Sequence, residues 1–179
     1  MKEIKIHDKS FEIYITDTEI VEIVNAVANS INHSGLENPL FIAVLNGSFL
    51  FAADIMRQIT IPNSEISFIK LSSYNGTESS GKVDELIGLN QNIRGRNIII
   101  LEDIIDTGNT LSKLSKILEE KEIRSIKVAT LLFKPDTYEK TIPIDYIGRK
   151  ISNKFVVGFG LDYNEIGRNL PHIYKLKTK

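Results

Sequence analysis

The first part of the chain alternates apolar and polar residues and then repeats apolar residues at helical spacing. Residues 4–15 alternate, which predicts a small hairpin or an extended ribbon. Thr16 and Glu19 have the spacing of a capping box, which satisfies the first backbone groups of a helix. The helix that follows should end at Gly35, because glycine is common just beyond a helix C-terminus. Its predicted buried face consists of Ile20, Ile23, Val24, Val27, Ala28 and Ile31.

Unbroken apolar runs farther along the chain predict strands that are buried on both faces. Two such runs, residues 40–45 and 98–101, are followed by polar or turn-forming residues. Further strands are expected at 65–71, 126–133, 144–147 and 155–159, and helices at 49–57 and 111–121. Strands that alternate with helices imply βαβ units, so we expect an α/β fold with a mostly parallel central sheet flanked by helices. We expect one domain over residues 1–179, with a core of about residues 17–150 and a small lobe built from residues 1–16 and 151–179.

The composition narrows the classes of function. The chain has 22 Lys and Arg residues against 23 Asp and Glu residues, whereas proteins that bind duplex nucleic acid usually carry a basic excess. The absence of cysteine excludes disulfides, thiolate metal sites and a cysteine nucleophile. The spacing of His7, His33 and His172 does not indicate a metal site. No apolar run has the length of a membrane span or a signal segment, so we expect a cytoplasmic protein without a membrane partner.

The segment most suited to chemistry follows the apolar run 98–101. In open parallel sheets, ligands bind outside the carboxyl ends of the strands. The residues at that place are Glu102-Asp103-Ile104-Ile105-Asp106-Thr107-Gly108-Asn109-Thr110, and a predicted helix follows them. Backbone amides and hydroxyls of Thr107, Gly108 and Thr110 can point at an anion on the helix N-terminus.

Three carboxylates beside this anion site would repel a simple phosphate. Vicinal ribose hydroxyls or a magnesium ion would resolve the conflict, because either gives the carboxylates a partner on the same ligand. A sugar phosphate is therefore the simplest ligand for the whole segment. In the structural alternative, Asp106 and Thr110 only cap the helix, and Glu102 and Asp103 are solvated charges.

A second phosphate-binding pattern lies in the long polar stretch 72–95, whose length is typical of a lid or a binding loop. Residues 76–83 match a P-loop except at the last position, where Val83 lacks the hydroxyl that would bind magnesium. Glu78 would also lie inside the phosphate cradle. A lid loop is therefore favoured over a P-loop kinase or triphosphatase.

Several motifs together resemble a known family. The segment 101–111 resembles the phosphoribosyl-pyrophosphate signature of type I phosphoribosyltransferases. The resemblance narrows to the hypoxanthine (guanine) phosphoribosyltransferases through segments that occur in the right order: 44–49, 72–74, 131–134, 155–158, 161–165 and 168–171. It spans nearly the whole chain. The resemblance implies transfer of a 5-phosphoribosyl group from phosphoribosyl pyrophosphate to N9 of a 6-oxopurine, hypoxanthine or guanine, which gives IMP or GMP and pyrophosphate and requires Mg²⁺.

The resemblance also implies roles for the residues around the signature. Asp106 is expected to act as general base or acid at N7 of the purine. Glu102 and Asp103 are expected to meet the ribose hydroxyls and to hold magnesium. The phosphoribosyl-pyrophosphate phosphate is expected against Asp106, Thr107, Gly108, Asn109 and Thr110.

The purine side of the site is implied by later motifs. Lys134 is expected to donate to O6, Phe155 to stack on the base, and the Val156 backbone to read the ring edge. Asp162 is expected beside the purine and as a magnesium ligand on the pyrophosphate side. The ordinary alternatives are a surface lysine at 134 and a core aromatic at 155.

The pyrophosphate side is expected to involve Asn46, Gly47 and Arg168, although Arg168 could instead pair with Glu165. Many family members carry lysine or arginine at the position of Asn46. We therefore expect this loop to bind pyrophosphate through main-chain donors at Gly47 and Ser48, with a strained or cis peptide bond before Asn46.

Lid and assembly expectations complete the sequence-based hypothesis. Ser73 and Tyr74 are expected on the loop that closes over the reaction. A homodimer or homotetramer is expected, because small α/β enzymes commonly form symmetric assemblies. A non-catalytic sensor of phosphoribosyl pyrophosphate remains an alternative, for which Lys134 and Phe155 would have no use.

Overall fold

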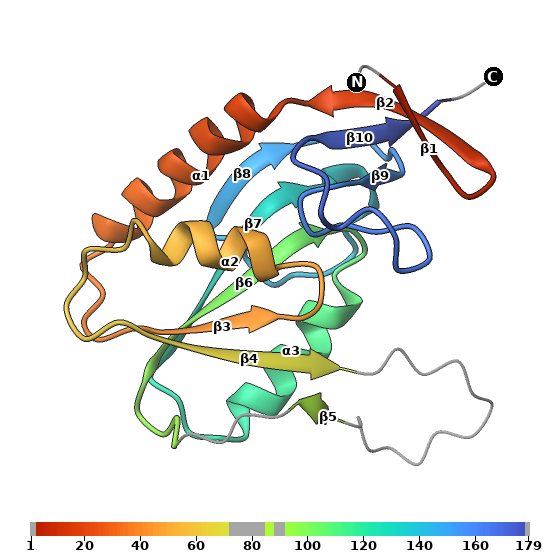
Figure 1. Ribbon diagram of the computed structural model, residues 1–179. Helices are drawn as coiled ribbons and strands as arrows, with labels where there is room; N and C mark the ends of the chain where they lie inside the picture. The colour runs from red at the N-terminus through yellow and green to blue at the C-terminus, as the bar shows by residue number, and fades with distance from the viewer. Residues whose placement is uncertain (1–2, 72–84, 88–91, 178–179) are drawn as a thin grey trace, which may run out of the picture.

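A six-stranded sheet forms the centre of the protein, shown as a computed structural model in Figure 1. The structure describes residues 3–71, 85–87 and 92–177. The strand order is β5 (Glu85–Ile87), β4 (Glu65–Leu71), β3 (Leu40–Val44), β6 (Asn97–Ile105), β7 (Ser125–Phe133) and β8 (Tyr146–Lys150). All neighbours are parallel except β5, which pairs antiparallel with β4 at the edge. The expected α/β fold with a mostly parallel sheet is confirmed.

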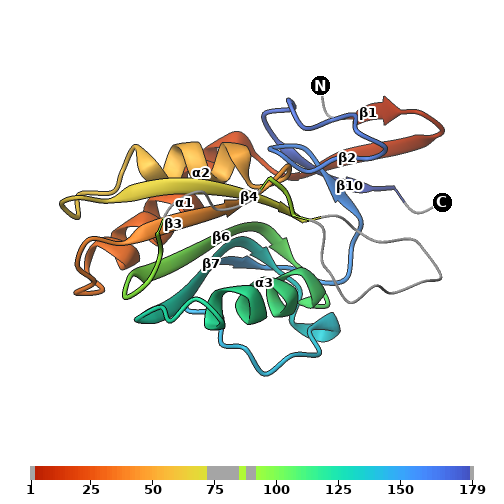
Figure 2. The same cartoon turned by 90° about the horizontal axis from the view of Figure 1, so that it is seen from below.

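Helices cover both faces of this sheet. α1 (Asp17–Asn32) and α2 (Phe49–Met56) lie on one face and α3 (Asn109–Glu119) on the other, as Figure 2 shows. The capping box of α1 is present, because the Glu19 amide donates to Thr16 Oγ1 and the Thr16 amide donates to Glu19 Oε2. All six residues of the predicted apolar face of α1 are buried. Burial of each large aliphatic side chain contributes about 1.5–3 kcal/mol relative to exposure.

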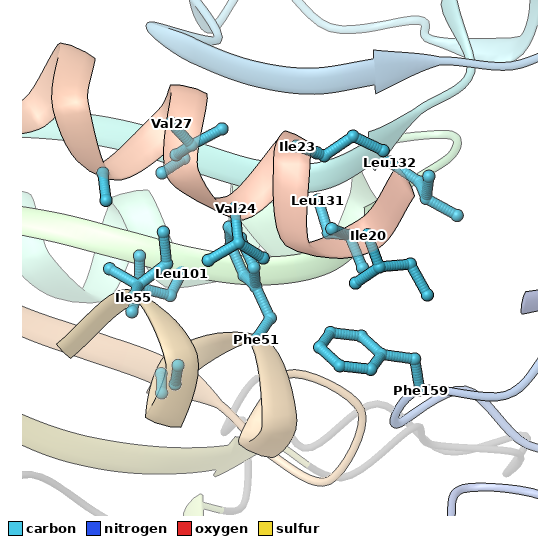
Figure 3. Close-up of a cluster of buried hydrophobic side chains, with 14 of the residues drawn as sticks. Ile20, Ile23, Val24, Val27, Phe51, Ile55, Leu101, Leu131, Leu132 and Phe159 are labelled. Carbon is cyan, nitrogen blue, oxygen red and sulfur yellow. The ribbon is translucent and has the colours of Figure 1, made fainter. Parts of the chain in front are cut away.

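The main core lies between the central sheet and the helices α1 and α2. Figure 3 shows Val24 of α1 and Phe51 of α2 pointing toward each other, and Leu101 of β6 belongs to the same cluster. Phe159, from the C-terminal part of the chain, points into the same cluster. The C-terminal segment is therefore anchored to the main core by apolar packing.

The two ends of the chain form a second, antiparallel sheet. Its order is β1 (Glu3–Ile6), β2 (Lys9–Ile15), β10 (Ile173–Leu176) and β9 (Val156–Val157). We call it the terminal sheet; it lies beyond the end of the central sheet near β6 and β7 (Figure 1). The expected hairpin at residues 4–15 is present as β1 and β2, whereas the strand expected at 155–159 is limited to β9 and β10 was not expected.

No helix in the described part of the chain has both the length and the hydrophobicity needed to cross a membrane.

Candidate active site

A cleft opens at the carboxyl ends of β3 and β6. The chain runs from β3 through α2 to β4, its neighbour on one side. It runs from β6 through α3 to β7, which lies on the opposite side of the β3–β6 pair. Ligands of open α/β sheets bind at such a point, where the strand order reverses. The cleft has a volume of about 410 Å³, and its walls include Gly47, Glu102, Asp103, Asn109 and Thr110.

The N-terminus of α3 forms one end of this region. Gly108 is the N-cap residue with φ of 79°, and no side chain caps the helix. The Ser112 amide donates to the Gly108 carbonyl at 2.9 Å, so the amides before Ser112 have no partner within the helix. A smaller cavity of about 110 Å³ is lined by Glu102, Thr107 and the first residues of α3. Free amides, the helix dipole and a small cavity together suit a bound phosphate.

Glycine is required at the turn into α3. A Cβ atom on Gly108 would lie 2.5 Å from Cε2 of Tyr138, and its φ value is one that other residues rarely adopt. The Tyr138 ring therefore packs directly against the backbone that faces the anion cavity.

Glu102 and Asp103 are buried carboxylates at the end of β6. Burial raises the pKa of the Glu102 carboxyl well above its ordinary value, and the neighbouring charge of Asp103 adds to the effect. Burial also raises the pKa of Asp103 to about 6, although the Ile104 amide donates to its Oδ1 at 2.9 Å. Among the described residues, no lysine or arginine forms an ion pair with either carboxylate.

These two carboxylates fit a divalent cation, because buried oxygen ligands without a cationic partner are stabilised by Mg²⁺. The third expected metal ligand, Asp162, is placed differently: its Oδ1 lies 2.8 Å from Nη2 of Arg168. Within the described ranges, no three acidic or histidine side chains are grouped closely enough to hold a metal ion.

Asp106 and Lys134 form an ion pair next to the anion cavity. Lys134 Nζ lies 2.6 Å from Asp106 Oδ2 and 3.4 Å from Asn153 Oδ1, and the lysine side chain is 9% exposed. Thr137 Oγ1 donates to the other carboxylate oxygen, Asp106 Oδ1. Burial alone would raise the pKa of Asp106, but the bonds from Lys134 and Thr137 and the lysine charge outweigh it and lower the pKa below its ordinary value. Lys134 is therefore a buried, paired lysine and not a surface one.

The loop after β3 contributes main-chain groups to the opposite wall. The peptide bond between Leu45 and Asn46 is cis, as expected. Gly47 is close to Asp103: a Cβ atom at this glycine would lie 1.7 Å from Asp103 Oδ2. The Ser48 amide donates to the Val44 carbonyl at 3.3 Å, so the expected donor role of Ser48 is not available in this conformation. The Gly47 amide has no hydrogen-bond partner among the described residues, so of the two expected donors it is the one that stays available.

Phe155 lies at the edge of the terminal sheet and is 44% exposed. Its ring contacts the edge of Tyr163 at a centroid distance of 5.7 Å and lies 6.2 Å from Phe11. Lys9 Nζ lies 4.3 Å from the Tyr163 centroid and 5.5 Å from that of Phe155. The exposure distinguishes Phe155 from a core aromatic. Val156, the next residue, is buried in β9.

Arg168 is held by contacts within the C-terminal segment. Its Nη1 donates to the Gly160 carbonyl at 2.9 Å, and its Nη2 lies 2.8 Å from Asp162 and 3.3 Å from Glu165. The Glu165 pair considered from the sequence thus exists beside a shorter contact to Asp162. The arginine charge also acts to lower the pKa of Asp103, against the larger effect of burial.

The structure brings most of the expected site residues to one end of the central sheet. The expected lid residues Ser73 and Tyr74 and the P-loop-like segment 76–83 lie outside the described residues. Two residues of the site were not predicted from the sequence: Thr137, which contacts Asp106, and Tyr163, which contacts Phe155. Tyr163 lies inside a segment already matched to the family, whereas no motif marks Thr137.

Comparisons with known proteins agree with this geometry. Residues 13–164 match the family model described as phosphoribosyl transferase domain. The hypoxanthine-guanine phosphoribosyltransferase of Staphylococcus epidermidis is 37% identical over 175 residues, which is 97% of each chain. A hypoxanthine-guanine phosphoribosyltransferase from Bacillus anthracis has a similar crystal structure, with a TM-score of 0.84, 38% identity and coverage of 98% of this chain and 99% of that one.

A hypoxanthine phosphoribosyltransferase from Staphylococcus aureus has the same TM-score of 0.84, at 36% identity over 93% of this chain and 91% of that one. These matches favour the phosphoribosyltransferase hypothesis over a P-loop enzyme and over a non-catalytic sensor. The chain therefore belongs to the type I phosphoribosyltransferase family, with hypoxanthine-guanine phosphoribosyltransferases as its relatives.

Proposed function

We propose that this protein transfers the 5-phosphoribosyl group of phosphoribosyl pyrophosphate to N9 of hypoxanthine or guanine, which gives IMP or GMP and pyrophosphate. The observation that carries the proposal is the Asp106–Lys134 ion pair, 2.6 Å long, beside the uncapped N-terminus of α3. The helix end suits the 5′-phosphate, and the ion pair suits the adjacent O6 and N7 atoms of a 6-oxopurine.

The reaction exchanges one bond at C1 of the ribose. The bond from C1 to the pyrophosphate oxygen breaks, pyrophosphate leaves with the electron pair, and N9 of the base forms the new bond. The base carries one proton more than the product requires, and Asp106 accepts it from N7. A lowered pKa keeps this carboxyl ionised and ready to accept a proton.

Lys134 would supply selectivity for the base. Its ammonium group donates to O6 of a 6-oxopurine. Adenine has an amino group at that position, which is itself a donor and finds no acceptor on the lysine. Because the lysine is buried, a base without an acceptor at that position forgoes a charged hydrogen bond in a desolvated place. Phe155 would stack on the base with its exposed face, while Val156 would contact the ring edge through its backbone.

The ribose and pyrophosphate would lie along the carboxylate wall. Glu102 and Asp103 would accept hydrogen bonds from the ribose hydroxyls and would hold Mg²⁺ there, and Asp162 would bind Mg²⁺ on the pyrophosphate side. When bound, the ion would neutralise charge on the leaving pyrophosphate. The Gly47 amide and Arg168 would contact the pyrophosphate oxygens. A homodimer or homotetramer in the cytoplasm is the expected working state.

The proposal is tested with a spectrophotometric assay of hypoxanthine, guanine and xanthine in the presence of phosphoribosyl pyrophosphate and Mg²⁺. Turnover of hypoxanthine or guanine is expected, and no turnover of any of the three would refute the assignment. Asp106→Asn is expected to lower kcat by about 10²-fold or more while the affinity for phosphoribosyl pyrophosphate changes little.

Asp136→Asn is the matched control, because Asp136 is an exposed carboxylate on the turn that follows Lys134. It should keep the activity of the unmodified protein. Equal losses of turnover and phosphoribosyl-pyrophosphate affinity in Asp106→Asn would instead identify Asp106 as a binding or capping residue.

A further inference from the structure

The turn after β7 places two side chains on one carboxylate. Lys134 is the N-cap of the short 3₁₀ helix η1 (Pro135–Thr137), and Thr137 is its last residue. Side chains three residues apart in a 3₁₀ turn lie one above the other. The lysine ammonium therefore contacts Asp106 Oδ2 while the threonine hydroxyl donates to Asp106 Oδ1. Each oxygen of the expected proton acceptor has its own donor.

We propose that Thr137 is a positioning residue that orients the Asp106 carboxylate for proton transfer at N7 of the base. A carboxylate has about four acceptor positions, so two bonds leave others free for the base. With Lys134 as its only partner, the carboxylate could rotate about its Cβ–Cγ bond around a single long, flexible side chain. The Thr137 hydroxyl adds a second point of attachment from a short, β-branched side chain. This inference rests on the proposed function of Asp106.

The turn that carries Thr137 is held by other contacts, so its hydroxyl can be removed without removing the turn. The Lys134 amide donates to the Ile105 carbonyl at 2.9 Å, which ties the start of the turn to the end of β6. Tyr138 donates through its hydroxyl to the Ile142 carbonyl at 2.6 Å and packs its ring on Phe133 at 5.3 Å.

The charged surroundings of Asp106 would stay the same after such a change. Lys134 is its ion-pair partner, Glu102 lies on the same strand and lines the same small cavity, and Lys140 lies beside Gly108. A valine at position 137 keeps the shape of threonine and alters none of these charges. A change in the behaviour of Asp106 then reports the lost hydrogen bond.

Thr137→Val is expected to lower kcat by about fivefold to tenfold and to leave KM for phosphoribosyl pyrophosphate unchanged. The acidic limb of the pH profile of kcat/KM for hypoxanthine should move to higher pH by about half a unit to one unit, because a donor to the charged form is lost. Thr137→Ser, which keeps the hydroxyl, should restore both values. Thr141→Val, the same change at an exposed threonine on the same connection, is the control and should match the unmodified protein.

An unchanged kcat and an unmoved acidic limb in Thr137→Val would overturn the inference. So would a rise in KM for both substrates with the acidic limb unmoved, because that result describes a purely structural residue.

A second measurement does not depend on turnover. Titration of the ¹³C carboxyl signal of Asp106 by NMR should give a higher pKa in Thr137→Val than in the unmodified protein, and equal values would overturn the inference. Failure of the proposed function is recognised separately, as absence of turnover in the unmodified protein.

Discussion

Substitution of Gly160 tests whether the C-terminal segment fixes the position of the loop after β3. Its φ is +97°, and a Cβ atom there would lie only 2.0 Å from the Gly47 carbonyl oxygen. Ordinary van der Waals contact begins near 3.4 Å, so in Gly160→Ala the new Cβ atom and the Gly47 carbonyl oxygen must move apart by roughly 1.4 Å. Gly47 belongs to the loop that we propose binds pyrophosphate, and it also approaches Asp103.

Two costs can be separated by a matched variant. Gly35 also has a positive φ, of +71°, but a Cβ atom there meets nothing within 4 Å. Gly35→Ala should therefore lower the unfolding free energy by about 1–2 kcal/mol, because the only cost is the strain of a left-handed backbone. Gly160→Ala should lose more, because the strain and the steric overlap occur together.

The effect on activity follows from the displaced loop. A misplacement of about 1 Å at a reacting group can reduce the rate by about 10²-fold. We therefore expect Gly160→Ala to lower kcat/KM for phosphoribosyl pyrophosphate by roughly tenfold to a hundredfold, with a much smaller change in KM for hypoxanthine. Urea unfolding and initial rates at varied concentrations of each substrate are the measurements. A displaced loop would be refuted if Gly160→Ala unfolds like Gly35→Ala and keeps its kcat/KM for phosphoribosyl pyrophosphate.

Two further predictions concern the carboxylate wall and the base. Since burial raises the pKa of Asp103 to about 6 from 3.8, the folded protein binds this proton more tightly than the unfolded chain, and its unfolding free energy should fall by up to about 3 kcal/mol as the pH rises from about 4 to 6. Asp103→Asn should make this slope shallower in urea unfolding of the ligand-free protein, and the part that remains belongs to Glu102, whose pKa is also raised by burial. A slope equal to that of the unmodified protein would contradict the assignment. Phe155→Leu should raise KM for hypoxanthine by roughly threefold to tenfold through the lost stacking, with KM for phosphoribosyl pyrophosphate as the internal comparison. Phe49→Leu, at a phenylalanine of similar exposure on α2, should leave both constants unchanged, and equal changes in the two variants would argue against stacking.

The helices and parallel strands were predictable because their signals are local. The capping box at Thr16 and Glu19 and the apolar face behind it lie within one helix, and the run 98–101 needs only burial on both faces. β10 was missed because it has four residues and exists through pairing with β2 near the other end of the chain. No local pattern in residues 173–176 reports that partner.

The candidate site shows the same division. Glu102 and Asp106 were identified because the signature places them in one short segment after a buried strand. Thr137 was missed because its hydrogen bond to Asp106 joins residues 31 positions apart, one after the end of β6 and the other after the end of β7. The hydrogen bond from the Ser48 amide to the Val44 carbonyl was also not predictable from the sequence, because it depends on the path of the chain into α2.

The pairing of β2 with β10 also has a consequence for biosynthesis. Ile15 pairs with Ile173, so about 160 residues must be translated before β2 meets its neighbour. At about 5–20 residues per second, the ribosome leaves that edge of the hairpin open for roughly 8–30 s. An open strand edge can pair with other chains, so the nascent protein is exposed to intermolecular strand pairing until its last strand emerges.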